Sequence, residues 1–213
     1  MNEKQRISPS VIRRLPRYYR FLSDLRRSGI VRISSAELSR RTGLTASQIR
    51  QDLNCFGGFG QQGYGYHVED LREQIGKILG IDRSLPLIVI GIGNLGRAIS
   101  CQIDFPSKGY DLVGLFDRKP SLIGQTVHGL PIRDIATLDD FCKEQRPQAA
   151  VLCIPKESAE ELAYKLVKLG IRGFLNFSHY DLSLSYEGIA VENIHFGDNL
   201  MVLSYRLHNP DQT

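Results

Sequence analysis

A glycine-rich turn constrains this chain more than any other feature. The apolar run Leu87-Ile88-Val89-Ile90 leads directly into Gly91-Ile92-Gly93-Asn94-Leu95-Gly96. A strand, a G-x-G-x-x-G turn and a helix in that order bind the pyrophosphate of a dinucleotide. Gly91 and Gly93 would permit the tight turn and let backbone N–H groups approach the phosphates, while Gly96 would permit close helix–strand packing. The turn therefore predicts a dinucleotide-binding domain.

A second strand-like run strengthens this interpretation. Residues 111–116 are mostly apolar and end at Asp117, about twenty residues beyond the glycine turn, where a carboxylate accepts from a ribose hydroxyl. Such a carboxylate favours NAD over NADP because a 2′-phosphate would meet its charge. Arg118 and Lys119 follow directly and leave that preference open. We expect NAD(H) as the cofactor, with Asp117 and Arg118 at its adenosine end.

The rest of this half alternates strands with helices. Val151-Leu152-Cys153-Ile154 is a predicted strand that Pro155 ends, a helix is predicted over 157–169, and another strand over 172–176. This alternation predicts a parallel sheet covered on both faces. Ligands bind at the carboxyl ends of such strands. The residues expected to line the nicotinamide end are therefore Cys153, Ile154, Pro155, Asn176 and Phe177, with a place in the core as the alternative for Phe177.

The two halves of the chain carry opposite charge. Residues 1–66 hold 12 Lys+Arg against 4 Asp+Glu, a net of +8, whereas residues 67–213 hold 15 against 19, a net of −4. A basic charge confined to one part predicts a polyanionic partner for that part. A solvated basic face is the alternative.

Helix signals in the basic part predict a helix-turn-helix. Pro16 is the expected first residue of a helix that Gly29 closes. Ser34-Ser35-Ala36-Glu37 has the form of a capping box before a short helix, and Thr45-Ala46-Ser47-Gln48 repeats the pattern before a helix over 48–55. A tight turn at Gly43 separates the two capped helices. The second helix of this motif enters the major groove of DNA.

Polar side chains on and near that second helix suit base and phosphate contacts. Glutamine and asparagine bond adenine, and arginine bonds guanine. The run 56–66 alternates glycine with aromatic residues and predicts the hairpin wing of a winged helix. A polar surface helix and a flexible glycine loop are the alternatives. The residues expected to contact DNA are Arg13, Arg14, Arg17, Ser47, Gln48, Arg50, Gln51, Asn54, Gln61, Gln62 and Tyr64.

An NAD-dependent oxidoreductase with an accessory domain is the alternative function. Hydride transfer needs an acid or base near the substrate, and His179 is the one well-placed candidate. About 35 residues follow Asn176, too few for a substrate domain of typical size. We therefore expect no catalytic residue. Leu200, Leu203 and Leu207 instead favour a C-terminal helix that packs against a partner subunit.

Composition bounds the remaining possibilities. The four cysteines are scattered and form no CxxC pair, which argues against a zinc site or a disulfide framework. No apolar run is long enough to span a membrane, and no apolar segment follows the N-terminus. We expect a cytoplasmic protein without a metal site.

Taken together, the motifs resemble those of the Rex family, bacterial repressors that sense the NADH/NAD balance. The resemblance covers nearly the whole chain. The stretches that carry it are 14–20 (RLPRYYR), 33–38 (ISSAEL), 48–53 (QIRQDL), 56–60 (FGGFG), 93–98 (GNLGRA) and 170–177 (GIRGFLNF).

The resemblance implies a winged-helix domain, a Rossmann domain and a C-terminal helix swapped into the partner of a homodimer. Members bind palindromic operators and release them when NADH binds. The boundaries expected here are a winged-helix domain over 1–80, a linker over 81–86, a Rossmann-like parallel-sheet domain over 87–194, and a dimerisation helix with its tail over 195–213.

Several positions depart from the family pattern. Members commonly have lysine where this chain has Gln51, and a basic pair where it has Gln61-Gln62. The family's signalling network joins an arginine, a tyrosine and an aspartate, which correspond here to Arg20, Gln102 and His195. An Arg–His contact does not replace an Arg–carboxylate pair. We therefore expect NADH to weaken operator binding less than in other members.

Overall fold

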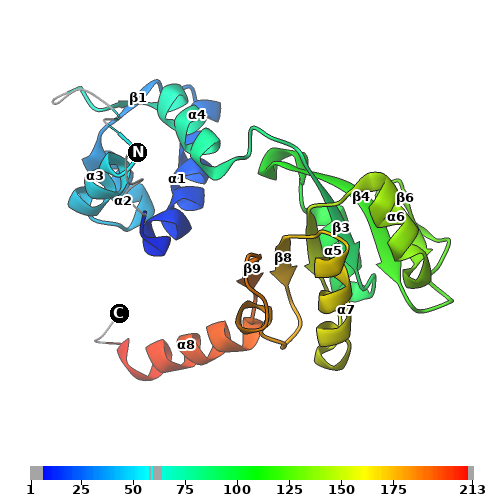
Figure 1. Cartoon of the computed structure of the whole chain (residues 1–213). Helices are drawn as coiled ribbons and strands as arrows, with labels where there is room; N and C mark the ends of the chain where they lie inside the picture. The colour runs from blue at the N-terminus through cyan, green and yellow to red at the C-terminus, as the bar shows by residue number, and fades with distance from the viewer. Residues whose placement is uncertain (1–6, 58, 60–63, 211–213) are drawn as a thin grey trace. The chain divides into compact units, whose positions relative to one another are not determined.

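The computed structural model describes residues 7–57, 59 and 64–210 (Figure 1). The chain divides between Asp82 and Arg83 into two units. The elements of the first unit are α1 Pro9–Arg27, β1 Arg32–Ile33, α2 Ser35–Thr42, α3 Ala46–Asn54, β2 Tyr66–His67 and α4 Val68–Leu79.

Helix α1 begins seven residues earlier than the sequence predicted. Pro9 stands in the first turn, and Pro16 lies inside the helix rather than at its start. The helix continues through Pro16 because a buried stripe lies on both sides of it, formed by Val11, Leu15, Tyr18, Leu22 and Leu25. Tertiary packing of that stripe outweighs the hydrogen bond that a proline removes.

The helix-turn-helix forms as the capping signals predicted. The Ser34 hydroxyl accepts from the Glu37 N–H and the Thr45 hydroxyl from the Gln48 N–H, both at 3.1 Å. Gly43 ends α2 in the left-handed region, with φ +67°. Helices α2 and α3 are thereby set around a short turn.

The wing prediction is tested only in part. Tyr66 and His67 pair antiparallel with Ile33 and Arg32, so the described strand of this region pairs with the segment before α2. Gln61 and Gln62 lie outside the described residues. Helix α4, which sequence reasoning did not identify, packs beside α1 and completes the core of the unit. That core includes Leu15, Leu22, Ile49, Leu53 and Ile75.

The second unit is built on a seven-stranded sheet in the described residues, with the order β5-β6-β4-β3-β7-β8-β9. Every pairing is parallel except that of β5 with β6. The fold prediction is thus confirmed. The strands are β3 Leu85–Ile90, β4 Tyr110–Asp117, β5 Thr126–Val127, β6 Leu130–Asp134, β7 Ala149–Leu152, β8 Gly173–Asn176 and β9 Ala190–Asn193.

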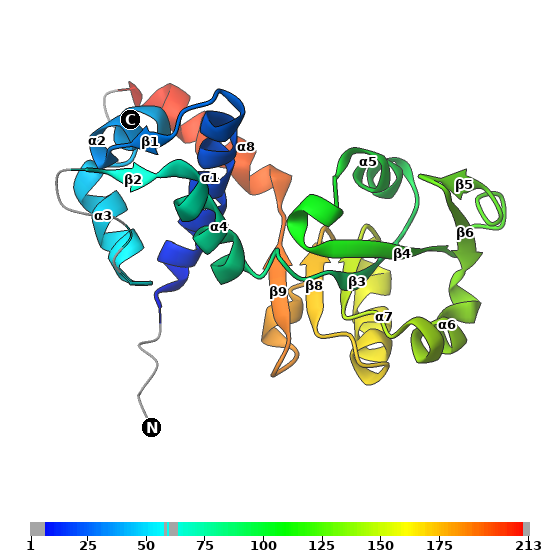
Figure 2. The same ribbon diagram turned by 90° about the horizontal axis from the view of Figure 1, so that it is seen from above.

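Helices cover both faces of this sheet, α5 on one and α6 and α7 on the other (Figure 2). The helices are α5 Asn94–Gln102, α6 Leu138–Gln145, α7 Lys156–Lys168 and α8 Phe196–His208, with short 3-10 turns at Pro106–Lys108, Ile135–Thr137 and Leu182–Leu184. Strand β3 sends Leu87 and Val89 into one core and Ile88 and Ile90 into the other. The period of two that places them follows from strand geometry.

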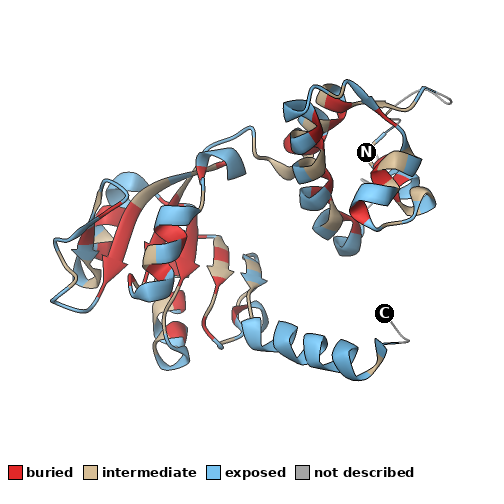
Figure 3. Cartoon of the chain, turned by 180° about the vertical axis from the view of Figure 1, so that it is seen from behind, coloured by how far each residue is buried: buried red, intermediate tan, exposed pale blue. Residues whose placement is uncertain are grey.

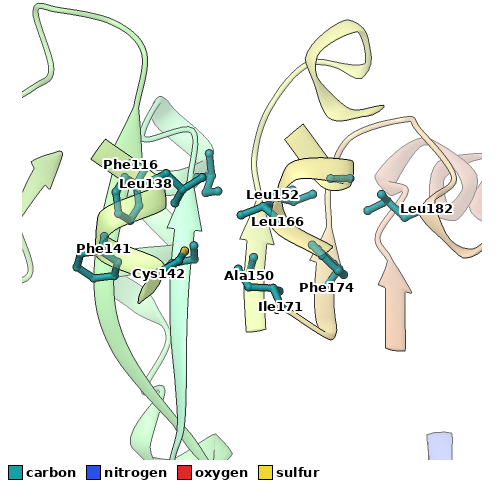
Figure 4. Close-up of a cluster of buried hydrophobic side chains, with 13 residues drawn as sticks. Phe116, Leu138, Phe141, Cys142, Ala150, Leu152, Leu166, Ile171, Phe174 and Leu182 are labelled. Carbon is teal, nitrogen blue, oxygen red and sulfur yellow. The ribbon is translucent and has the colours of Figure 1, made fainter. Parts of the chain in front are cut away.

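The core under α6 and α7 depends on a glycine in the middle of β4. Phe116 and Phe141 meet edge to face, with ring centroids 5.0 Å apart and an interplanar angle of 78° (Figure 4). A Cβ at Gly114 would stand 2.7 Å from the Phe141 Cζ. The bare backbone at this position therefore makes the room that the Phe141 ring occupies.

Helix α8 has no buried residue (Figure 3). Its exposed large apolar residues are Phe196, Leu200, Met201, Val202, Leu203, Tyr205 and Leu207. Apolar side chains on more than one side of an exposed helix indicate an interaction surface. None of the helices within the described ranges is long and apolar enough to cross a membrane.

Candidate functional site

The glycine turn between β3 and α5 closes tightly on itself and on the neighbouring strand. Gly91 has φ +89°, and a Cβ there would collide with the Cys153 carbonyl. A Cβ at Gly96 would collide with the Gly91 carbonyl oxygen. Both glycines are therefore required by the chain itself.

Gly93 differs from the other two. Its φ is −71°, which any residue adopts, and a Cβ there would meet nothing within 4 Å. Neither strain nor packing within the chain explains a glycine at this position. The open space is compatible with the predicted approach of a ligand to the backbone, which stays a prediction.

The first turn of α5 offers an anion site beside Gly93. Gly93 is the N-cap and provides no side-chain cap for the free N–H groups. The positive end of the helix dipole adds to these donors. Turn and helix end together form the cradle that a pyrophosphate fits.

The turn opens into a cleft of about 1370 Å³. The predicted cofactor residues that line it are Gly91, Gly93, Asn94, Asp117, Arg118, Cys153, Ile154 and Pro155. Other lining residues, which sequence reasoning missed, come from α7 and from the segment after β6, among them Ile135, Ala136, Ser158 and Leu162. Their position in the sequence could have identified them. Residues that follow a parallel strand, or that begin the next helix, lie near the carboxyl ends of the strands, where ligands bind.

Asp117 ties the turn to the end of β4. One oxygen of its buried carboxylate accepts from the Ile92 N–H at 2.6 Å, and the other accepts from the Lys119 N–H at 2.8 Å. A carboxylate has about four acceptor positions, so each oxygen can take a further donor such as a ribose hydroxyl. Next to it, Arg118 donates to the Ser158 hydroxyl at 3.3 Å across the cleft.

Asn176 and Phe177 do not line this cleft in the described structure. The buried Asn176 amide donates to the Tyr180 carbonyl at 2.7 Å and to Asn193 Oδ1 at 2.8 Å, and its oxygen accepts from the Ser178 hydroxyl at 2.7 Å. Asn176 therefore holds the loop after β8 in place. Phe177 packs against Phe196, with ring centroids 5.9 Å apart. Leu95 and Gly96 lie within α5, behind the turn.

The thiols and histidines of this unit do not gather in one cluster within the described residues. No group of three potential metal ligands occurs among the described residues. Burial raises the pKa of the Cys153 thiol to about 12, which makes it a poor nucleophile. His179 stacks on His195, with ring centroids 5.5 Å apart.

The exposed face of α3 is the candidate DNA-binding surface. Ser47, Arg50, Gln51 and Asn54 are exposed and Gln48 is half-buried, while Arg50 donates to the Ser35 hydroxyl at 3.0 Å. Arg13 and Arg17 are exposed on α1, and Tyr64 is 70% exposed.

Arg14 is placed differently from the other predicted DNA contacts. Its guanidinium donates to both oxygens of Asp52, at 2.6 and 2.7 Å. The side chain is thus engaged inside the unit. Asp52 is a further residue that sequence reasoning missed, because its partner lies 38 positions away.

The three residues of the predicted signalling network lie on separate elements. Arg20 is exposed on α1 of the first unit. Gln102 ends α5 and His195 precedes α8, both in the second unit. The half-buried His195 carries an Nδ1 without a hydrogen-bond partner among the described residues. The joint role of these residues stays a prediction.

Known proteins resemble this chain over nearly its whole length. Residues 6–54 match the family described as "Putative DNA-binding protein N-terminus", and residues 82–180 match the CoA binding domain. A "Redox-sensing transcriptional repressor Rex" of Thermoanaerobacter pseudethanolicus is 47% identical over 211 residues, 99% of this chain and 94% of the relative. Another, of Clostridioides difficile, is 51% identical over 199 residues, 93% and 94% of the two chains.

Solved structures agree with these relatives. The crystal structure of RSP in complex with β-NAD⁺ and operator DNA superposes with a TM-score of 0.90 at 46% identity, covering 98% of this chain and 95% of that one. RSP with β-NADH gives a TM-score of 0.87 at 43% identity, covering 97% and 96%. The glycine turn, the helix-turn-helix and these full-length matches together confirm the resemblance: the chain belongs to the Rex family of redox-sensing transcriptional repressors.

Proposed function

We propose that this chain represses transcription as a homodimer, binding a palindromic operator through its first unit while NAD(H) in the cleft of its second unit regulates that binding. The observation that carries the proposal is Gly93, a glycine that neither backbone strain nor packing requires, beside an uncapped helix end in a large cleft. RSP, which binds both β-NAD⁺ and operator DNA, is similar over nearly the whole chain.

The residues of the cleft fit a dinucleotide. The N–H groups at Gly93 and Asn94 would hold the pyrophosphate, Asp117 and Arg118 the adenosine end, and Cys153, Ile154 and Pro155 the approach to the nicotinamide. When bound, the nicotinamide supplies an oxidised or a reduced ring that differs in charge. The protein responds if one form favours a dimer whose two α3 helices match successive major grooves.

Helix α8 supplies the dimer contact in this proposal. Seven large apolar side chains on one exposed helix suit burial against a second copy of the chain. Leu203→Glu places a charge in that surface and should shift the chain to monomer in sedimentation. Ser204→Glu, a change at the neighbouring exposed polar position, is the control.

No enzymatic activity is part of the proposal. The relatives are named as repressors. His179, the acid–base candidate that the sequence suggested, does not line the cleft and stacks on another histidine. The oxidoreductase alternative therefore gains no support.

The direct test measures operator binding with NAD⁺ and NADH side by side. Fluorescence anisotropy of a labelled pseudo-palindromic duplex at moderate salt should show sequence-selective binding, weaker with NADH than with NAD⁺. The proposal fails if the chain does not distinguish this duplex from a shuffled one, or if neither nucleotide changes the affinity.

The size of the NADH effect tests the role of the diverged positions. We propose that Gln102 and His195 reduce the response, because neither gives Arg20 a carboxylate partner. Gln102→Tyr with His195→Asp should enlarge the ratio of affinities in NAD⁺ and NADH. The control is His179→Asp, which places a carboxylate at the histidine that stacks on His195. It should leave the ratio of affinities in NAD⁺ and NADH unchanged. Full release of the unmodified chain at low NADH would contradict this role.

A further inference from the structure

Helix α3 holds a buried carboxylate in its last turn. Asp52 is 2% exposed, and three donors from α1 converge on it. Arg14 Nε and Nη2 donate to its two oxygens at 2.6 and 2.7 Å, and the Tyr18 hydroxyl donates to Oδ2 at 2.7 Å. We call Arg14, Tyr18 and Asp52 the α1–α3 clamp.

The electrostatics of the clamp keep each group in one state. Burial favours the neutral form of Asp52, but hydrogen bonds from Arg14 and Tyr18 hold the pKa of its carboxyl below the ordinary value. Burial, and then the hydrogen bond to Asp52, raise the pKa of the Tyr18 hydroxyl. Around neutral pH the carboxylate is therefore charged and the hydroxyl neutral, so both donors point at the carboxylate.

Stability alone does not explain such a clamp. A buried ion pair is commonly replaced by apolar residues of similar volume at no loss of stability. What a bidentate Arg–carboxylate pair adds is a fixed geometry. The buried residues of α3 are Ile49, Asp52 and Leu53, and the packing of the two apolar ones is not directional. Among the described residues, Asp52 is the one buried polar residue of α3, and its directional hydrogen bonds restrict the rotation of the helix about its own axis.

That rotation decides what the opposite face can reach. Ser47, Arg50, Gln51 and Asn54 point out of the unit from the same nine-residue helix. Bidentate contacts to base edges need side chains held within about 0.5 Å and 10–20° of their working geometry. Apolar packing and the turn at Gly43 hold α3 less tightly than that, and the paired hydrogen bonds of Asp52 supply the remaining constraint.

We propose that Asp52, held by Arg14 and Tyr18, is a positioning residue that sets how well α3 distinguishes the operator from other DNA. The inference rests on the proposed DNA-binding function. It also replaces the role expected for Arg14, because a guanidinium engaged with Asp52 orients the reading helix instead of neutralising a phosphate.

The experiment compares discrimination with stability in the full-length chain. The variant Arg14→Met, Tyr18→Phe, Asp52→Leu removes the clamp and fills its volume. The probes are the duplex that the wild-type chain enriches from a randomised pool and a shuffled duplex of the same composition, both titrated with NAD⁺ present at several salt concentrations. Arg13→Met, an exposed neighbour on α1, is the matched control for the loss of a cation.

The clamp variant should melt near the wild-type temperature, bind the operator about tenfold more weakly, and bind the shuffled duplex with unchanged affinity and salt dependence. Arg13→Met should weaken both duplexes together and reduce the slope of log affinity against log salt by about 0.9. An unchanged ratio of operator to shuffled affinity in a folded clamp variant overturns the proposal. A loss on both duplexes with a reduced slope also overturns it, since Arg14 would then contact phosphate.

Tyr18→Phe decides the question if the clamp variant does not fold. It removes one hydroxyl from a retained ion pair, and the ratio should fall about threefold, as one hydrogen bond is worth. An unchanged ratio overturns the proposal. Failure of the wild-type chain to distinguish the two duplexes would instead refute the proposed function, so the two failures are separable.

Discussion

The variant Gly93→Ala separates the effect of this glycine on folding stability from its effect on nucleotide binding. The backbone at Gly93 is extended, with φ −71° and ψ −160°, and the added methyl meets nothing within 4 Å. Alanine at a compatible position stabilises by about 0.4–1 kcal/mol through the unfolded state, whereas alanine at an N-cap loses up to about 1 kcal/mol. These effects nearly cancel, so the melting temperature should move by less than about 4 °C.

Nucleotide affinity should change far more than stability. The methyl group stands where a pyrophosphate would approach the N–H groups of the first turn of α5. Hydrogen bonds to a charged group are worth about 1.5–3 kcal/mol, so the Kd for NADH should rise about 10- to 150-fold.

Gly96→Ala is the matched comparison, because its methyl would collide with the Gly91 carbonyl oxygen. It should lower stability by about 1–3 kcal/mol. Calorimetry of NADH binding and thermal melting of both variants give the answer. An unchanged Kd in Gly93→Ala would refute the ligand argument, and an unchanged melting temperature in Gly96→Ala would refute the packing argument.

Three further predictions follow from caps, charge and burial. Ser34→Ala and Thr45→Ala each remove an N-cap and should cost about 1 kcal/mol, a loss of roughly 4–8 °C in the melting of a unit of this size; no change would show that the caps are redundant. The lowered pKa of the Asp52 carboxyl means that its contribution to stability is present above the ordinary value of about 3.9 and is lost as the pH falls below it. The clamp variant should match the wild-type stability at neutral pH, so acid unfolding should leave the wild type less stable than the clamp variant below about pH 4; a constant difference would contradict the sign. Cys55 and Cys101 are exposed, whereas burial raises the pKa of Cys153 to about 12 and of Cys142 to about 11. A thiol titration at pH 8 should therefore count two fast-reacting thiols in the native chain and four in denaturant. Four fast-reacting thiols in the native chain would be inconsistent with the fold.

Local signals explain why much of the nucleotide cleft was predictable. The geometry of a turn such as Gly91 to Gly96 depends on short-range sterics, so it can be predicted from the residues of the turn alone. The capped starts of α2 and α3 were predictable for the same reason. Asn176 was harder to assign, because a polar residue after a strand serves either a ligand or its own loop, and the hydrogen bonds to Tyr180, Ser178 and Asn193 decide for the loop.

Long-range pairing and misread local signals account for what the sequence left open. The α1–α3 clamp joins residues 38 positions apart, and no local pattern distinguishes a buried aspartate from an exposed one. The early start of α1 was hidden because Pro16 has the appearance of a helix start. Helix α4 could have been predicted, since Glu69 and Asp70 stand in its first turn and Gly80 ends it in the left-handed region.

The glycine in the middle of β4, Gly114, restricts the order in which substitutions at positions 114 and 141 can accumulate in this core. Because a Cβ at Gly114 would stand 2.7 Å from the Phe141 ring, a side chain at 114 requires that ring to shift or residue 141 to become smaller. The reverse order opens a void beside Phe116 that one added methyl partly refills. Two substitutions that are each harmful alone are therefore compatible together, and a drift between alternative cores at this site must cross a less stable intermediate.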